Sequence, residues 1–239
     1  METGKTIKYS SMIVVGIFFL LVILIFILSA IKDRKLLETV TKSHRGTGTE
    51  RELVLKLLKA GFPSQTIFHD LYLKNRYGNY SQIDVALATK VGIIVFEVKK
   101  YSGWIFGNAS QTNWTQILAY GKQKYYFYNP ILQNRKHIED LKAKITDYQN
   151  IPIYSVVVFF GDCTFKNVTV PKDTFLVKSP EVIRVVNKII KESELANYKS
   201  KRDIVNILSA AVINGESTEI SKKHIENIND MLEKNRAFN

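Results

Sequence analysis

The sequence contains a single cysteine, Cys163, so this chain cannot form an internal disulfide. One unpaired thiol in 239 residues is typical of a reducing compartment. The four histidines are scattered, and no Cys/His cluster has the spacing of a zinc site. The sequence also contains neither Gly-x-Gly-x-x-Gly nor Gly-x-x-x-x-Gly-Lys-Ser/Thr, which argues against nucleotide-driven motor chemistry by this chain.

Acidic residues are the scarcer charged class, with 22 Asp and Glu against 34 Lys and Arg, and the formal net charge is +12. A surplus of this size favours a polyanionic partner, which can be nucleic acid or an anionic membrane surface. The hydrophobic share of 46% and the length suit one core of ordinary size with an added membrane segment. Composition alone does not choose between the two partners.

One long stretch, residues 13–31, lacks both charge and proline. As a helix rising about 1.5 Å per residue it would span roughly 29 Å, close to the hydrocarbon thickness of a bilayer. We therefore predict a short tail over residues 1–12 and a transmembrane helix over residues 13–31. The alternative is a signal peptide, which usually has a shorter apolar region and ends in a small-x-small cleavage site. Ser29-Ala30 matches such a site poorly.

Flanking cations predict the orientation of this segment, because cytoplasmic flanks carry an excess of Lys and Arg. More cations follow the segment than precede it: Lys32, Arg34, Lys35, Lys42 and Arg45 against Lys5 and Lys8. This predicts a single-pass membrane protein whose main domain is cytoplasmic. Four Asn-x-Ser/Thr triplets would suit the opposite side, but such triplets arise often by chance in an Asn-rich polar chain: Asn79, Asn108, Asn113 and Asn167.

Residues 32–45 are polar and charged, and we interpret them as a juxtamembrane linker. Periodicity and turn residues then predict one domain over residues 46–178 and a helical segment over residues 179–239. A first helix is expected from residue 49, with Thr49 and Glu52 as its capping box.

The remaining elements follow from the same patterns. Strands are expected at residues 66–73, 81–88, 93–99, 103–107, 154–160 and 174–177, with two weaker candidates within 114–128. Later helices are expected at residues 129–148, 179–191, 201–213 and 221–235. This order predicts an α/β fold with a mixed central β-sheet flanked by helices.

Three polar side chains interrupt the apolar hairpin at residues 81–99: Asp84, Glu97 and Lys99. Side chains alternate along a strand, so Glu97 and Lys99 share a face, and Asp84 reaches it if the register allows. Two carboxylates can hold Mg²⁺ or Mn²⁺, and the Val98 carbonyl between the key side chains is a further candidate ligand. With Lys99 stabilising developing charge, such a site hydrolyses phosphodiesters. The alternative is a charge pair on an exposed sheet face.

The order of several short motifs resembles the nuclease-related domain (NERD) family, which is similar to the wider PD-(D/E)xK nucleases. The motifs are His69-Asp70-Leu71-Tyr72-Leu73, Ser81-Gln82-Ile83-Asp84, Phe96-Glu97-Val98-Lys99, Trp104-Ile105-x-Gly107, Asn129-Pro130-x-x-Gln133-Asn134 and Val156-Val157-Val158-Phe159. The likeness covers roughly residues 46–175. It implies a restriction-endonuclease-like core in which Asp84 and Glu97 hold a divalent metal and Lys99 orients or activates water.

The resemblance also implies two further site residues. Glu50 matches the family's early glutamate and would complete the metal shell, with Glu52 competing for that role. Gln133 matches a helix-borne glutamine that faces the site in related nucleases. One departure is that the family usually reads Gly-Glu, whereas Thr49 separates Gly48 from Glu50 here. His69 and His137 are expected to be structural or surface groups.

Basic residues near these motifs are candidates for guiding a phosphate backbone: Lys100, Lys122, Lys124, Arg135 and Lys136. The tyrosines of residues 125–128 can stack bases, although a half-buried strand explains them equally well. Nothing in the sequence predicts strong sequence specificity. Two functions are therefore considered: a membrane-anchored, Mg²⁺-dependent nuclease acting on DNA or RNA, and a non-catalytic membrane-tethered module that binds nucleic acid or protein.

Overall fold

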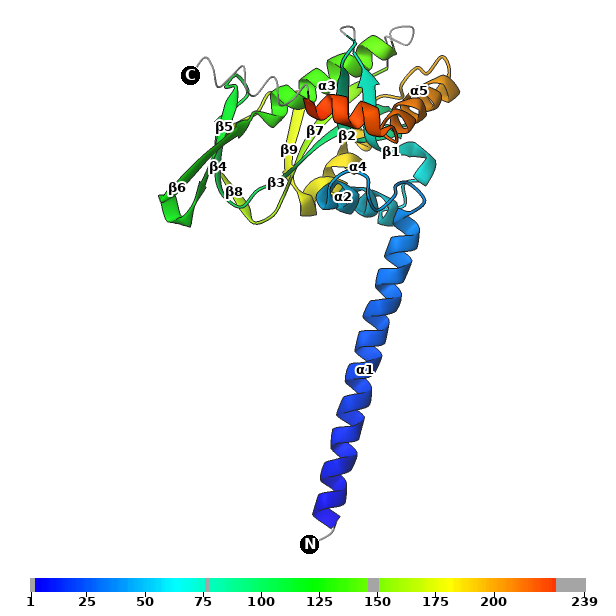
Figure 1. The fold of residues 1–239 in the computed structure, drawn as a ribbon, viewed down its shortest axis with the longest axis vertical. Coiled ribbons are helices and arrows are strands. Elements are labelled where there is room, and N and C mark those ends of the chain that lie inside the picture. The colour runs from blue at the N-terminus through cyan, green and yellow to red at the C-terminus, as the bar shows by residue number, and fades with distance from the viewer. Residues whose placement is uncertain (1–2, 76–77, 146–150, 227–239) are drawn as a thin grey trace.

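A computed structural model describes residues 3–75, 78–145 and 151–226. The long helix α1 (Thr3–Leu37) leads into a domain built of β-sheets and further helices (Figure 1). Within the described residues, α1 is the one helix long and apolar enough to cross a membrane, over Gly16–Leu37, and none of that window is buried. A membrane anchor and a signal sequence both satisfy this description.

The larger sheet has five strands in the order β1-β2-β3-β7-β9. β1, β2 and β3 are antiparallel neighbours, whereas β7 and β9 continue the sheet in parallel. Their bounds are Ile67–Lys74, Tyr80–Thr89, Gly92–Lys100, Ile153–Phe160 and Thr174–Lys178. β3 and β7 are apolar and buried along most of their length, as expected of central strands covered on both faces.

The smaller sheet has four strands in the order β6-β5-β4-β8. Their bounds, in chain order, are β4 Gly103–Asn108, β5 Asn113–Leu118, β6 Gln123–Tyr128 and β8 Cys163–Thr169. β4, β5 and β6 form an antiparallel meander, and β8 pairs with β4 in parallel. β8 was not predicted from the sequence, because it is a partly exposed edge strand whose partner lies far away in the chain.

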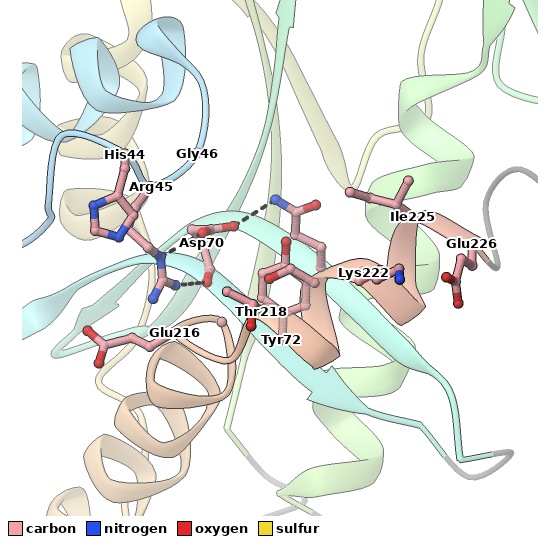
Figure 2. Close-up of a pocket in the computed structure, with 13 residues that line it drawn as sticks. His44, Arg45, Gly46, Asp70, Tyr72, Glu216, Thr218, Lys222, Ile225 and Glu226 are labelled. Atoms are coloured by element: carbon pink, nitrogen blue, oxygen red, sulfur yellow. Dashed lines mark hydrogen bonds and ion pairs between the residues drawn. The ribbon is translucent and has the colours of Figure 1, made fainter.

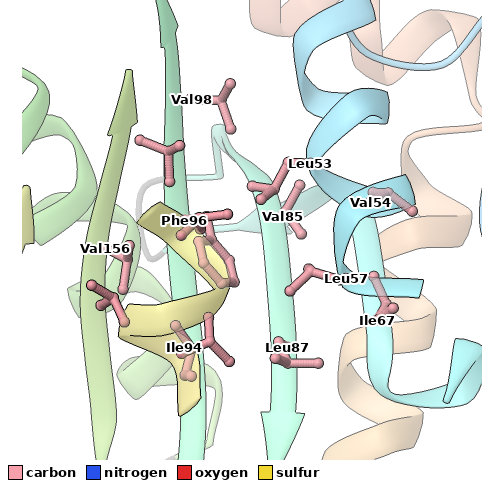
Figure 3. Close-up of a cluster of buried hydrophobic side chains, with 14 of the residues drawn as sticks. Leu53, Val54, Leu57, Ile67, Val85, Leu87, Ile94, Phe96, Val98 and Val156 are labelled. Carbon is pink, nitrogen blue, oxygen red and sulfur yellow. The ribbon is translucent and has the colours of Figure 1, made fainter. Parts of the chain in front are cut away.

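Four helices cover the larger sheet. α2 (Gly48–Lys59) and α4 (Val182–Glu192) share one hydrophobic core, and α3 (Pro130–Lys144) and α5 (Lys201–Asn214) share the other. Figure 3 shows the first core, where Leu53 and Leu57 of α2 meet Val85, Ile94 and Phe96 of the sheet. The predicted α/β fold, a mixed sheet flanked by helices after one long apolar helix, is confirmed.

Some helix boundaries differ from the prediction. The cap of α2 is Thr47, whose side chain accepts a hydrogen bond from the Glu50 N–H, so the expected pair of Thr49 and Glu52 is wrong. Asn129 caps α3 with a proline after it, as predicted. The predicted ends of two helices, at residues 148 and 235, lie outside the described residues, although residues 218–226 are helical.

The segment between α1 and α2 is attached to the domain. Arg45 donates from Nε to Asp70 Oδ2 (2.8 Å), from Nη2 to the Asp70 carbonyl (2.6 Å) and from Nη1 to the Val212 carbonyl (3.1 Å). Arg45 and Asp70 line a pocket of about 610 Å³. His44, Tyr72 and side chains between residues 216 and 226 also line it (Figure 2). The segment after α1 therefore helps to fasten β1 to α5.

Candidate active site

Asp84 stands where the pairing of two strands ends. The β2–β3 ladder runs from Thr89 and Gly92 to Val85 and Phe96, and Asp84 is the next residue of β2. Its Oδ2 accepts a hydrogen bond from the backbone N–H of Val98 (2.7 Å). The carboxylate thus takes the place of a ladder carbonyl, and this brings Asp84 beside the strand that carries Glu97 and Lys99.

Glu97 and Lys99 lie on one face of β3, as the alternation predicted. Phe96 and Val98 point into the hydrophobic core, whereas Lys99 Nζ is 2.7 Å from Glu97 Oε1. The same ammonium donates to Oε1 of Gln133 on α3 (2.9 Å). Glu97 is fully buried, and Lys99 reaches the partly exposed rim. The structure therefore brings Asp84, Glu97, Lys99 and Gln133 together.

His137 joins this group, which sequence reasoning missed. It follows Gln133 by one helical turn, and its Nε2 is 3.4 Å from Glu97 Oε2. Its Nδ1 is 2.9 Å from the Ser81 hydroxyl on β2. The signal in the sequence was the i, i+4 spacing, which puts Gln133 and His137 on one face of α3.

Glu50 is held in the interior at the start of α2. The Thr47 hydroxyl donates to its Oε1 (2.7 Å), and His69 Nε2 lies 3.4 Å from its Oε2. His69 Nδ1 in turn lies 2.7 Å from the hydroxyl of Thr41. Glu52 is exposed and pairs with Lys56 of the same helix, so Glu50 is the buried carboxylate of α2.

The buried charges shift one another's pKa values. Burial, followed by the negative charges of Glu97 and Glu50, raises the pKa of Asp84 well above its usual range. Burial would also raise the pKa of Glu97, but the Lys99 ammonium and the neighbouring His137 outweigh it and lower that pKa. Burial opposes the charge on Lys99, yet Glu97 and Asp84 outweigh it and raise its pKa. The electrostatics thus favour an ionised Glu97 beside a charged Lys99.

The donor atoms fit a hard divalent cation. Both Glu97 oxygens are buried, with Lys99 Nζ 2.7 Å from Oε1 and His137 Nε2 3.4 Å from Oε2. A buried carboxylate is costly unless it is paired, and oxygen is the ligand atom that Mg²⁺ prefers. The N–H and C=O of a strand residue point to the same edge, so the Val98 carbonyl faces Asp84 as well.

The number of side-chain ligands is small. Over the described ranges, no three His, Cys, Asp or Glu side chains stand close enough together to hold a metal. A cation here would have Asp84, Glu97 and the Val98 carbonyl as ligands, with water completing its shell and Glu50 nearby. Mg²⁺ commonly keeps several waters and binds through one or two carboxylates.

The five basic residues predicted to contact nucleic acid are all exposed: Lys100, Lys122, Lys124, Arg135 and Lys136. Lys100 ends β3, one residue after Lys99, and two of the others lie on the exposed side of α3. Lys122 and Lys124 lie at the β5–β6 hairpin, away from the helices. The pocket in Figure 2 is a separate feature, since neither Asp84, Glu97 nor Lys99 lines it.

Residues 45–160 match the family model of the nuclease-related domain, NERD. This range contains Glu50, Asp84, Glu97, Lys99 and Gln133. The resemblance to the nuclease-related domain seen in the sequence is thus confirmed over this range, and it suggests a nuclease-like fold.

A protein of Bacillus anthracis described as uncharacterized is 28% identical over 217 residues, which is 89% of this chain and 99% of that protein. The likeness to it thus extends beyond the range of the domain. No solved structure matches this chain.

Proposed function

We propose that this protein is a metal-dependent nuclease that hydrolyses phosphodiester bonds of DNA or RNA without strong sequence specificity. The observation that carries the proposal is Glu97, a fully buried carboxylate beside Asp84, with Lys99 Nζ 2.7 Å from its Oε1 and His137 Nε2 3.4 Å from its Oε2. An exposed cross-strand charge pair would be solvated, so the burial of Glu97 supports a ligand role instead.

Each residue of the candidate site has a distinct role in the proposed hydrolysis. Asp84, Glu97 and the Val98 carbonyl would hold Mg²⁺ or Mn²⁺, which when bound polarises the phosphate and lowers the pKa of a water nucleophile. Lys99 presents its ammonium to the charge that develops on the phosphate. Gln133 accepts a hydrogen bond from that ammonium and keeps it oriented. Glu50 adds negative charge behind Asp84.

We propose further that α1 is a retained anchor in the bilayer and that the domain faces the cytoplasm. The apolar surface of the helix is exposed along its whole membrane-length window, which suits contact with lipid. Arg34 and Lys35 lie in its last turn, next to the domain. Cations at this end fit the cytoplasmic flank of a single-pass protein.

One observation favours the alternative of a non-catalytic binding module. The described residues bring together two carboxylates at Val98 but no third metal donor side chain. A site that binds nucleic acid through the same fold without cleavage would need no complete metal shell.

Cleavage assays on the full-length protein in detergent separate the two functions. We expect labelled DNA or RNA to be cut with Mg²⁺ or Mn²⁺ and not with EDTA. Asp84→Asn, Glu97→Gln and Lys99→Met should each lose at least about 100-fold in rate. Glu52→Gln and Lys188→Met, which change exposed charges away from the site, serve as matched controls. Binding without cleavage under every metal condition would refute the nuclease.

A further inference from the structure

The four-stranded sheet has one face in the core and one face in solvent. Ile105 of β4 and Trp114 of β5 are fully buried and pack with Phe159 of β7. The alternate residues point the other way, so Trp104 is 36% exposed and Tyr126 is 66% exposed. The α-helices pack mainly on the larger sheet, and Ile131 of α3 packs on the buried face of the smaller one. In Figure 1 the smaller sheet extends away from α2, α4 and α5.

We call this solvent-facing side the outer face of the small sheet. Cross-strand pairing defines its two rows: Trp104, Ile117 and Lys124, and then Phe106, Thr115 and Tyr126. Tyr128 follows Tyr126 on the same face and is about half exposed. Lys124 Nζ lies 5.0 Å from the Tyr126 ring centroid, and Lys166 Nζ of β8 lies 5.1 Å from that of Trp104. Aromatic rings and ammonium groups are thus interleaved across the face.

The four strands of the small sheet carry positive charges and no carboxylates. None of the four strands contains an Asp or Glu, and the sequence has no acidic residue between Glu97 and Glu139. That stretch carries six cations: Lys99, Lys100, Lys122, Lys124, Arg135 and Lys136. A polyanion is the complementary partner of such a surface.

The outer face is joined to the candidate active site at both ends of the meander. Gly103, the first residue of β4, lies four positions after Lys99 in the sequence. At the other end β6 runs into Asn129, which caps the helix that carries Gln133 and His137. The Asn129 amide also donates to the Gln111 carbonyl (2.7 Å), which fixes the β4–β5 loop to the start of this helix.

We propose that the outer face of the small sheet binds single-stranded nucleic acid by stacking bases on Trp104, Tyr126 and Tyr128, with Lys124 and Lys166 on the phosphates. Four-stranded sheets with aromatic side chains on an open face recognise single strands in this way, because a duplex hides the faces of its bases. The proposal deepens the nuclease function, on which it rests, by assigning a single-stranded substrate or a single-stranded flank.

Binding is measured on a protein that does not cut. Full-length Glu97→Gln protein in nanodiscs, with EDTA present, is titrated into a labelled oligothymidylate of about 16 nucleotides and into a duplex of equal length. We expect the single strand to bind more tightly. Tyr126→Ala and Trp104→Ala should each weaken single-strand binding by about 5- to 150-fold, since stacking contributes about 1–3 kcal/mol per base. Tyr126→Phe, which keeps the ring, should bind like the parent.

Tyr120→Ala is the matched control. Tyr120 is 97% exposed, but it lies in the turn between β5 and β6 and not on the outer face. We expect it to leave binding within about twofold. Equal losses in Tyr120→Ala and Tyr126→Ala, or equal affinity for duplex and single strand with no effect of Tyr126→Ala, would overturn the proposal.

Two further outcomes are informative. Hydrogen exchange of β6 should slow with the oligonucleotide, whereas slowing only in phosphatidylserine nanodiscs would assign the face to lipid and overturn the proposal. The nuclease function is tested separately. If the wild type binds single strands through these rings but does not cleave them, the nuclease function is refuted and the binding face is supported. If the wild type cleaves but Tyr126→Ala does not weaken binding, the binding face is refuted and the nuclease function is supported.

Discussion

Replacing Arg45 by alanine should destabilise the whole domain although the residue lies just outside its first helix. The Arg45 side chain is only 6% exposed and makes three hydrogen bonds, two to Asp70 and one to Val212 of α5. Without the Arg45 guanidinium, the buried Asp70 carboxylate loses its ion pair and keeps the Gln82 amide as a side-chain donor. Breaking a buried pair from one side costs about 3–5 kcal/mol, because the other charge stays uncompensated.

The assay is urea unfolding of the full-length protein in detergent, followed by the fluorescence of the buried Trp114. With a slope of about 2 kcal/mol per M, a loss of about 3–5 kcal/mol lowers the midpoint by roughly 1.5–2.5 M. Arg184→Ala is the control, since Arg184 is 69% exposed and pairs with Glu181 at the surface. Exposed pairs contribute about 0–1 kcal/mol.

The double variant Arg45→Ala with Asp70→Asn, compared with the same two single changes, isolates the interaction. It should cost less than the sum of the single changes, because it removes both charges together. The reasoning is refuted if Arg45→Ala lowers the midpoint no more than Arg184→Ala, or if the two single changes simply add.

Three other predictions concern the site and the fold. His137→Ala should reduce cleavage or metal affinity by about 10- to 100-fold, measured by titrating activity with Mg²⁺, because outer partners of a metal ligand have effects of this size. Mg²⁺ at 100 times its Kd should stabilise the wild type by about 2.7 kcal/mol in thermal unfolding, and Glu97→Gln should abolish the gain. Burial raises the pKa of Tyr198 to about 12 from 10.0, so its contribution to stability is complete below pH 10 and is lost as the pH rises through 12. Tyr198→Phe should therefore show a smaller alkaline loss of stability in urea titrations at pH 10 and pH 12.

The grouping of Asp84, Glu97 and Lys99 was predictable because it depends on local geometry. Strand alternation alone places Glu97 and Lys99 on one face, and the short turn at Lys90-Val91 fixes which residues of β2 lie opposite. The sequence could not show that pairing stops at Val85, which lets Asp84 bond to the Val98 N–H. That interruption depends on how β1, β2 and α2 pack together, which no local pattern encodes.

Contacts between distant segments explain the remaining differences. His137 meets Glu97 only once α3 lies across the sheet, and β8 becomes a strand only through pairing with β4. The cap of α2 is a similar case. Both Thr47 and Thr49 have a glutamate three residues later, but only Thr47 leaves Glu50 facing the buried His69. Capping chemistry allowed either choice, and tertiary burial selected one.

Helix α1 and the candidate site are linked through residues 38–46. Thr41 lies four residues after the end of α1 and hydrogen-bonds His69, and His69 contacts Glu50. Burial, then the charge of Glu97 and then that of Glu50 raise the pKa of Asp84. Residues 38–46 therefore support the site as well as β1. A shortened protein that begins at residue 38 keeps Thr41 and Arg45, whereas one that begins at residue 47 loses both. If the segment were only a tether, the two would unfold at the same urea concentration and cleave at the same rate. The buried contacts of Thr41 and Arg45 predict that the shorter one is weaker in both measurements.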